Sequence, residues 1–216
     1  MSERENSPAF KQALASGVAD LNLQISEEKQ GTLLAYITLL NRWNKAYNLT
    51  AVRDQAEMIP RHLLDSLSVS AYLQGEHVLD VGTGPGLPGI PLAIIYPDTQ
   101  FTLLDSNGKK IRFVRQAVLE LGLKNVQAVQ ARVEAYGPPQ LFDTIVTRAF
   151  ASLAEILDLT AHLLSPAGRL LAMKSRQTQD ELVASDLHGR SVEVIPLQVP
   201  QLEGERYAVL ITHNTE

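Results

Sequence analysis

The chain has 216 residues, a formal net charge of -5, 45% hydrophobic residues and no cysteine. This composition is typical of a soluble globular protein, excludes a disulfide framework and thiolate chemistry, and argues against non-specific binding of nucleic acid. No apolar run approaches the roughly 20 residues of a membrane span, and the polar first residues form no secretion signal, so we expect a cytoplasmic protein with no membrane contact.

The first third of the chain shows helical spacing and no strand pattern. Helix start signals stand at Ser7, Ser26 and Asp54, and apolar residues recur after each at helical spacing. The third pattern runs to about Tyr72, and Pro60 either kinks it or opens a new turn. The expected division of the chain is a helical region over residues 1–73, with 1–6 disordered, and a second domain over 74–216.

From residue 77 onward, strand and helix patterns alternate, which is typical of a parallel α/β sheet. Expected strands cover 77–81, 100–105, 126–130, 142–147 and 169–173, and expected helices cover 87–96, 108–121, 153–164 and 178–187. The residues at 166–168 predict a turn. The last two apolar runs, 192–197 and 207–212, are predicted to form an antiparallel pair.

A glycine-rich turn, Gly82-Thr83-Gly84-Pro85-Gly86, follows the first predicted strand. Alternating glycines let the backbone take positive φ angles and approach a ligand closely. The NAD fingerprint needs a third glycine where Leu87 stands, and Asp80 precedes the first glycine by two positions. We therefore favour S-adenosylmethionine (AdoMet) over NAD, with Asp80 facing its ammonium group directly or through water. A turn without a ligand is the alternative, since glycine spacing alone is a weak indication.

Other candidate ligand residues follow the later strands. Asp105 ends the second strand about 20 residues after the glycines, where nucleotide-binding folds place a ribose ligand; its alternative role is the cap of the next helix. The backbone at 132–134 can bind adenine, with Val133 as an apolar contact. The alternative role of Glu134 is that of a helix-start acid. Arg148 and Lys174 end strands, so each is expected to face an anion or the cofactor.

The connector over residues 47–53 is unusually polar. Asn48 and Arg53 offer an amide and a guanidinium to a substrate, but their spacing alone favours a helix-ending loop with local hydrogen bonds. His62 and Asp65 lie three positions apart on one helical face and are able to pair; a buried, hydrogen-bonded histidine is the favoured interpretation. Because the net charge is negative, any contact with RNA must come from a local group of basic residues.

Five runs of residues resemble the bacterial small-subunit ribosomal RNA methyltransferase G family, also called glucose-inhibited division protein B. The runs are 42–53, 61–66, 80–91, 103–106 and 147–151, and the likeness extends over roughly residues 26 to 213. The first two runs make the likeness specific, because many methyltransferases share the glycine motif. Residues 1–25 match nothing that we identify.

The resemblance implies a seven-stranded Rossmann-like AdoMet-dependent methyltransferase fold with an N-terminal helical extension. It implies methylation of N7 of guanine 527 in 16S rRNA, and the sequence leaves open whether naked RNA or the small subunit is the substrate. No metal-binding cluster and no obligate protein partner are evident in the sequence, which leaves a metal requirement open. Cofactor contacts carry over to Gly82, Leu87, Val133, Glu134 and Arg148; to these the residue-based analysis adds Gly84 and Asp105. No catalytic residue is certain, and the candidates for RNA positioning are Asn48, Arg53, His62 and Lys174.

Two other classes of function are compatible with the sequence. A methyltransferase acting on a small molecule or a protein would be active without RNA. A non-catalytic RNA-binding or assembly protein would bind RNA without affinity for AdoMet. An NAD dehydrogenase is the weakest alternative, because Leu87 stands where that class needs glycine.

Overall fold

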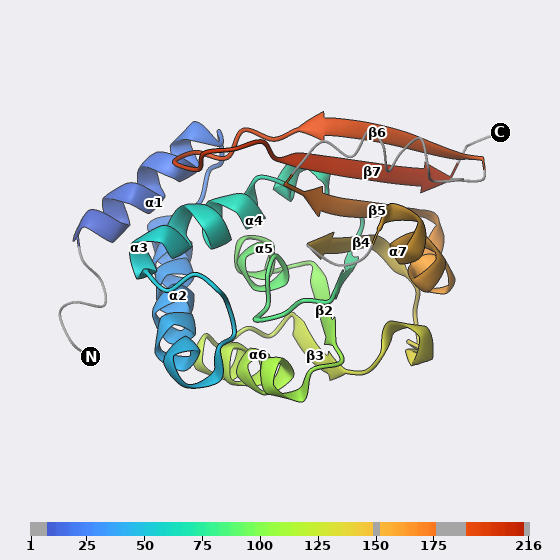
Figure 1. The fold of residues 1–216 in the computed structure, drawn as a ribbon, viewed down its shortest axis with the longest axis horizontal. Coiled ribbons are helices and arrows are strands. Elements are labelled where there is room, and N and C mark those ends of the chain that lie inside the picture. The colour runs from blue at the N-terminus through green and yellow to red at the C-terminus, as the bar shows by residue number, and fades with distance from the viewer. Residues whose placement is uncertain (1–7, 149–151, 176–188, 214–216) are drawn as a thin grey trace.

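The computed structural model describes residues 8–148, 152–175 and 189–213. Its centre is a seven-stranded sheet with the order β3-β2-β1-β4-β5-β7-β6 (Figure 1). The strands are β1 (His77–Val81), β2 (Gln100–Asp105), β3 (Val126–Gln130), β4 (Phe142–Arg148), β5 (Leu164–Lys174), β6 (Arg190–Pro196) and β7 (Tyr207–His213). Strands β1 to β5 are parallel, whereas β7 lies antiparallel between β5 and β6. The predicted parallel sheet with an antiparallel final pair is confirmed.

The helices alternate with the strands after a helical N-terminal region. They are α1 (Pro8–Asp20), α2 (Glu27–Tyr47), α3 (Gln55–Met58), a π-helical turn (Ile59–Leu64), α4 (Asp65–Leu67), α5 (Gly89–Ile95), α6 (Gly108–Glu120) and α7 (Leu153–Thr160), with 3₁₀ turns at Ser70–Tyr72, Val133–Ala135 and Ala161–Leu163. Ser26 and Asp54 accept hydrogen bonds from the first-turn backbone, as expected of N-caps. The helix predicted over 178–187, like residues 1–6, lies outside the described residues.

Alternate residues of each central strand enter two different cores. On β1, Val78 packs on one face of the sheet and Leu79 on the other, and the period of two repeats on the neighbouring strands. The first core also takes in the N-terminal helices, since it runs from Leu14 in α1 to Ala208 in β7. Helix α2 packs against both α5 and α6, so the helical region shares its buried surface with the sheet.

Two predicted boundaries are wrong for local reasons, whereas the second role considered for Pro60 is confirmed. Pro60 stands in the first turn of a new segment, because the pattern over 54–72 divides into α3, the wider π-helical turn, α4 and a 3₁₀ turn. The helix expected from Leu87 begins at Gly89. The turn expected at 166–168 is absorbed into β5, where the register with β4 shifts; a Cβ on Gly168 would stand 2.9 Å from a β4 carbonyl, so glycine permits the close approach.

Two helical glycines test how tightly the N-terminal helices are packed. A Cβ on Gly17 of α1 would stand 2.3 Å from the buried Leu64 side chain, whereas a Cβ on Gly31 of α2 meets nothing within 4 Å. We expect Gly17→Ala to destabilise the protein by about 1–3 kcal/mol through overpacking. Gly31→Ala should stabilise it by up to about 1 kcal/mol through helix propensity. Urea unfolding measures both, and a Gly17→Ala protein as stable as the wild type would contradict the packing.

Candidate functional site

The glycine turn is held from inside by the carboxylate of Asp80. Oδ2 accepts a hydrogen bond of 2.6 Å from the Thr83 hydroxyl and one of 2.8 Å from the Gly89 N–H, so one oxygen ties both ends of the turn. Asp80 is fully buried, and burial raises its pKa to about 6 although both bonds act to lower it. The direct contact of Asp80 with a ligand is therefore not available in this geometry; its part is to shape the turn.

The N-terminal helices hold the same turn from outside. The hydroxyl of Tyr36 on α2 donates a hydrogen bond of 2.8 Å to the Pro85 carbonyl. Tyr36 is completely buried, and burial raises its pKa well above the usual value, so it remains a neutral donor. The turn is thus fixed by the sheet through Asp80 and by the helical region through Tyr36.

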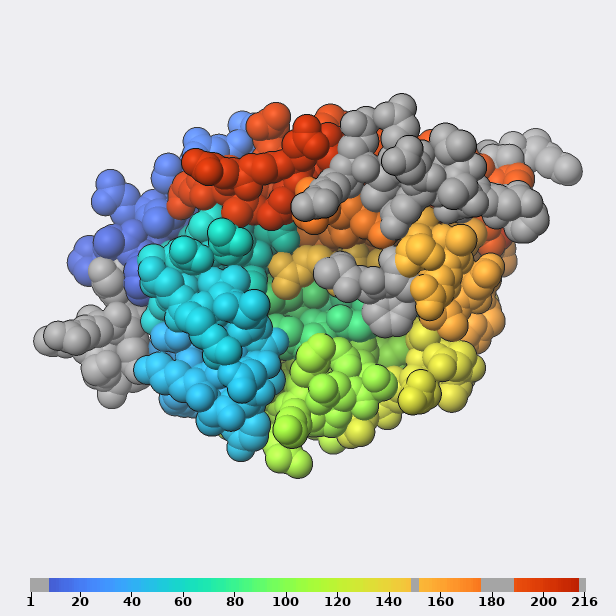
Figure 2. Space-filling view, viewed as in Figure 1, coloured from blue at the N-terminus to red at the C-terminus, as the bar shows by residue number. Residues whose placement is uncertain are grey.

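Two cavities meet at the carboxyl ends of the parallel strands, where ligands bind in open α/β sheets. The first, of about 470 Å³, is bounded by the π-helical turn, the glycine turn and the ends of β4, β5 and β7, and Figure 2 shows the surface hollowed between these cyan, green and orange regions. The second, of about 410 Å³, lies beside β2 and the 3₁₀ turn after β3. Gly82 and Lys110 line both cavities, so the two adjoin at the turn.

All seven predicted cofactor residues line one cavity or the other. The first contains Gly82, Gly84, Leu87 and Arg148. The second contains Gly82, Asp105, Val133 and Glu134. The sequence therefore grouped residues that the fold brings together, although their individual contacts with a ligand stay predictions.

Asp105 faces the second cavity with both carboxylate oxygens already oriented. Oδ2 accepts a hydrogen bond of 2.9 Å from the Gly84 N–H, and Oδ1 accepts one of 2.8 Å from the Asn107 N–H. Asp105 is not the N-cap of α6, which was its alternative role. The N-cap is Asn107, whose side chain accepts from the first-turn N–H groups of α6. Lys110 adds a cation 3.7 Å from Oδ2. Asp105 thus links the glycine turn to the cavity wall.

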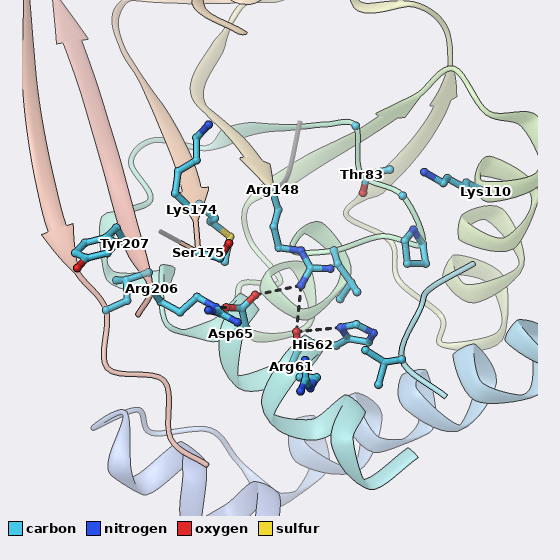
Figure 3. A pocket seen from close by; sticks show the side chains of 17 residues that line it. Arg61, His62, Asp65, Thr83, Lys110, Arg148, Lys174, Ser175, Arg206 and Tyr207 are labelled. Carbon is cyan, nitrogen blue, oxygen red and sulfur yellow. Dashed lines mark hydrogen bonds and ion pairs between the residues drawn. The ribbon is translucent and has the colours of Figure 1, made fainter. Parts of the chain in front are cut away.

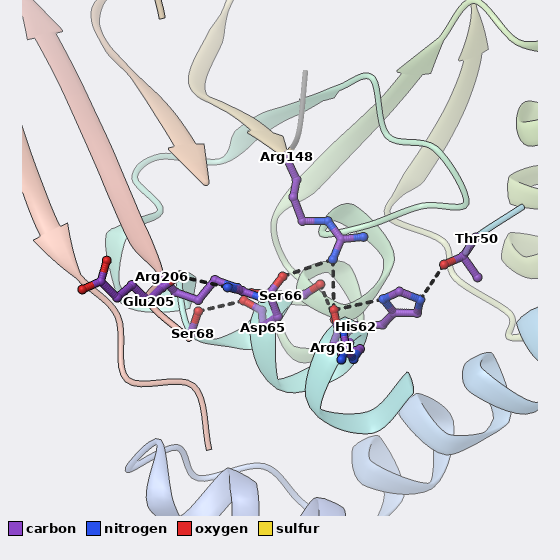
Figure 4. A network of polar contacts seen from close by, with 9 residues as sticks. All are labelled: Thr50, Arg61, His62, Asp65, Ser66, Ser68, Arg148, Glu205 and Arg206. Carbon is purple, nitrogen blue, oxygen red and sulfur yellow. Dashed lines mark hydrogen bonds and ion pairs between the residues drawn. The ribbon is translucent and has the colours of Figure 1, made fainter. Parts of the chain in front are cut away.

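Arg148 at the end of β4 reaches across the first cavity to the N-terminal helices. Its Nη1 lies 3.1 Å from Asp65 Oδ2 and donates a second hydrogen bond, of 3.2 Å, to the Arg61 carbonyl (Figure 4). Arg206, which precedes β7, approaches the other Asp65 oxygen at 3.3 Å. One buried carboxylate therefore joins the helical region, the centre of the sheet and the C-terminal hairpin, as Figure 3 shows from the cavity.

His62 is buried and lines the first cavity without pairing with Asp65. Its Nδ1 lies 2.9 Å from the Arg61 carbonyl, which only accepts hydrogen bonds, so Nδ1 carries the proton. Its Nε2 then accepts from the Thr50 hydroxyl at 2.9 Å. Burial, followed by the charge of Arg148, lowers the pKa of His62 to about 4, and the imidazole is neutral at pH 7.

The remaining RNA-positioning candidates fall into two groups. Lys174 lines the first cavity. Asn48 and Arg53 line neither of the two cavities, and Arg53 donates to Asn48 Oδ1 at 2.8 Å and to the Asn44 carbonyl at the end of α2. These bonds agree with the interpretation of residues 47–53 as a helix-ending loop with local hydrogen bonds. A contact of either residue with RNA stays a prediction.

Arg206 and its pairing with Asp65 were missed by the sequence reasoning. Arg206 lies in a connector between two strands with no motif around it, and only the topology of the final hairpin brings it to the cavity. Lys110 was not singled out either, although its place in the first turn of α6, after a strand that ends in an acid, indicated a position near the ligand.

The residues present fit AdoMet. A Cβ on Gly84 would find only the Gly82 carbonyl, at 3.9 Å, so the bare glycine leaves open space beside the turn. Asp105 offers an acceptor to ribose hydroxyls in the adjoining cavity. Asp80 Oδ1 is buried next to the turn without a hydrogen-bond partner among the described residues, which adds negative charge where a cationic group binds. Together with the strand order, these features define a Rossmann-like AdoMet-dependent methyltransferase.

Comparisons with known proteins identify the family. The model of the family "rRNA small subunit methyltransferase G" matches residues 29–210, and the chain belongs to this family. Proteins named ribosomal RNA small subunit methyltransferase G are 50% identical in Photobacterium profundum, over 94% of this chain and 98% of the relative, and 54% identical in Psychromonas ingrahamii, over 88% and 92%.

Solved structures of lower identity share the fold. A SAM-dependent methyltransferase from Aquifex aeolicus has a TM-score of 0.55 at 19% identity, covering 73% of this chain and 93% of the other. A protein described as an O-methyltransferase from Klebsiella pneumoniae, with its activity not established, has a TM-score of 0.59 at 14% identity, covering 96% and 100%. These likenesses concern the fold alone.

The described residues contain neither a metal-binding cluster nor a membrane-spanning helix. Within 8–148, 152–175 and 189–213, no three or more acidic or histidine side chains gather as a metal site would need. None of the helices in the same ranges is both long enough and apolar enough to span a bilayer.

Replacement of Asp105 tests the second cavity. Asp105→Asn should weaken AdoMet binding about tenfold or more, equivalent to about 1.4 kcal/mol, because an amide cannot accept from two ribose hydroxyls with both of its polar atoms. Asp143→Asn is the control, since Asp143 also accepts two backbone N–H bonds but lies outside both cavities. Isothermal titration calorimetry measures the affinities; equal affinities for the two variants would remove Asp105 from the site.

The neutral state of His62 predicts a pH dependence of stability. The folded pKa, about 4, lies below the unfolded value of 6.5, so the unfolded chain binds a proton first as the pH falls. Stability due to His62 is complete above pH 6.5 and is lost toward pH 4, by about 3 kcal/mol. Urea unfolding between pH 7 and about pH 4.5 should show a flatter profile for His62→Gln than for the wild type. Replacement of the exposed His162 is the control and should leave the profile unchanged.

Proposed function

We propose that this protein transfers a methyl group from AdoMet to N7 of guanine 527 in 16S rRNA, as naked RNA or within the small ribosomal subunit. The family and the sequence resemblance support the substrate. The observation that carries the proposal is the junction of the two cavities at Gly82 and Lys110. A nucleoside in the second cavity places its reactive end at this junction, and the first cavity, with its volume of about 470 Å³, has room for a base.

The proposal assigns each cavity a part of the reactants. Asp105 holds the ribose of AdoMet, and Val133 and Glu134 contact its adenine. Gly82, Gly84 and Leu87 surround the amino-acid end, and the target guanine enters the first cavity beside Arg148. His62 and Lys174 border that base. The helical region, residues 1–73, supplies one wall of the first cavity, and the second domain, 74–216, supplies the rest. No protein partner is required, and the reaction takes place in the cytoplasm with ribosomal RNA.

The chemistry requires positioning more than proton transfer. When bound, AdoMet supplies a methyl group on a sulfonium, which N7 of guanine accepts with an in-plane lone pair while the sulfur keeps the electrons of the broken bond. N7 carries no proton at neutral pH, so the chain needs no general base there. His62, neutral and engaged at both ring nitrogens, orients the cavity wall. Holding the reactants in line contributes up to about 7–11 kcal/mol to the barrier reduction.

The direct test is methyl transfer with a mapped product. The protein is incubated with labelled AdoMet and small subunits or 16S rRNA from a strain that lacks this modification. We expect one methyl group per RNA, on N7 of guanine 527, located by reductive strand cleavage. Subunits that already carry the modification are the control and should accept no label. Methylation of a small molecule or a protein without RNA, or RNA binding without AdoMet affinity, would instead support one of the two alternative classes.

A further inference from the structure

The outer end of the first cavity is built by the C-terminal hairpin, which the proposed contacts with cofactor and guanine do not use. Arg206 is fixed there twice. Its backbone carbonyl accepts a hydrogen bond of 2.8 Å from Leu197 N–H, where the connector closes before β7. Its side chain points into the cavity toward Asp65, with Nε 3.3 Å from Oδ1 (Figure 3). The guanidinium is therefore held in one orientation, and its side chain is only 22% exposed.

The acid that orients Arg206 does not neutralise it. Asp65 is shared with Arg148, so two guanidinium groups face one carboxylate. The other charges of the cavity are matched: Arg61 pairs with Glu57 at 3.4 Å and Lys110 with Asp105 at 3.7 Å. His62 is neutral, and Lys174 adds a further cationic side chain to the lining. Within the described residues, the group formed by Arg148, Asp65 and Arg206 keeps one positive charge.

Arg206 also retains hydrogen-bond donors. Its Nε faces Asp65, and Nη1 donates one bond, of 2.9 Å, to the Glu205 carbonyl. A guanidinium has five N–H donors, so three remain without a partner among the described residues. Partly buried cations and donors of this kind are costly unless an anion meets them. AdoMet brings no net negative charge to balance the group, because its sulfonium and ammonium outweigh its single carboxylate.

A phosphodiester of the substrate supplies both the missing charge and the acceptors. We propose that Arg206, held by Asp65, binds the RNA phosphodiester adjacent to the target guanosine. This inference rests on the proposed function. The planar fork of arginine suits two phosphate oxygens, and its anchoring by Asp65 lowers the entropy lost on binding. The C-terminal hairpin is then a substrate subsite that sets how deeply the nucleotide enters the cavity.

The test compares Arg206→Gln with Arg190→Gln on small subunits that lack the modification. Glutamine retains a donor for Asp65, and Arg190 lies at the far end of the same hairpin, beside His213 and outside the cavities. We expect Arg206→Gln to raise KM for the subunit about tenfold or more, with AdoMet affinity within about twofold of the wild type. It should also reduce the slope of log KM against log salt by about 0.7 to 1, the loss of one phosphate contact. Arg206→Lys should restore the slope while leaving KM raised.

Three results would overturn the inference: an unchanged salt slope in Arg206→Gln, an equal rise of KM in Arg190→Gln, or a loss of AdoMet affinity as large as the loss of RNA affinity. Circular dichroism and urea unfolding show whether each variant folds. If Arg206→Gln does not fold, Arg206→Lys replaces it as the test variant, and its KM is compared with that of the wild type. Failure of the proposed function is recognised separately, because the wild-type protein would then methylate no small-subunit RNA under any salt condition.

Discussion

The site depends on one buried carboxylate oxygen. Asp80 Oδ2 accepts from the Thr83 hydroxyl and from the Gly89 N–H, and these two bonds close the glycine turn over the end of β1. The arrangement has an electrostatic cost, since full burial raises the pKa of Asp80 to about 6 and disfavours the charged form. A cationic ligand beside the turn offsets this cost, so the buried charge of Asp80 favours binding of a sulfonium amino acid.

A second shared carboxylate, Asp65, assembles the first cavity from segments that are far apart in the chain. The π-helical turn presents the Arg61 carbonyl to Arg148, and Asp65 just after it holds Arg148 and Arg206 together. The ion pairs of Asp65 with Arg148 and Arg206 form only when the N-terminal helices are packed on the sheet. The common core and the hydrogen bond from Tyr36 to the glycine turn hold the helices in this position. The helical region is in this sense part of the site rather than an appendage.

Local patterns predicted the sheet and the grouping of the candidate cofactor residues along the two cavities, because each depends on residues close in sequence. The period of two along β1, the glycines after it and the acid at the end of β2 are all local. The ion pairs that build the first cavity could not be predicted in the same way. Asp65 pairs with Arg206 across 141 positions, a separation that no spacing rule covers. The buried, hydrogen-bonded state favoured for His62 is confirmed by its bond with Thr50.

The uneven placement of charge resolves an apparent conflict with an RNA substrate. A chain with a net charge of -5 repels the phosphate backbone at long range, and it therefore lacks the general attraction that drives non-specific binding. The positive charge that remains is concentrated in a cavity where Arg148 and Arg206 share one acid. A cavity admits only a nucleotide that leaves its helix or loop. The cations in the cavity therefore stabilise only this extruded conformation of the RNA. Selectivity then follows from weak general attraction combined with strong binding at one point.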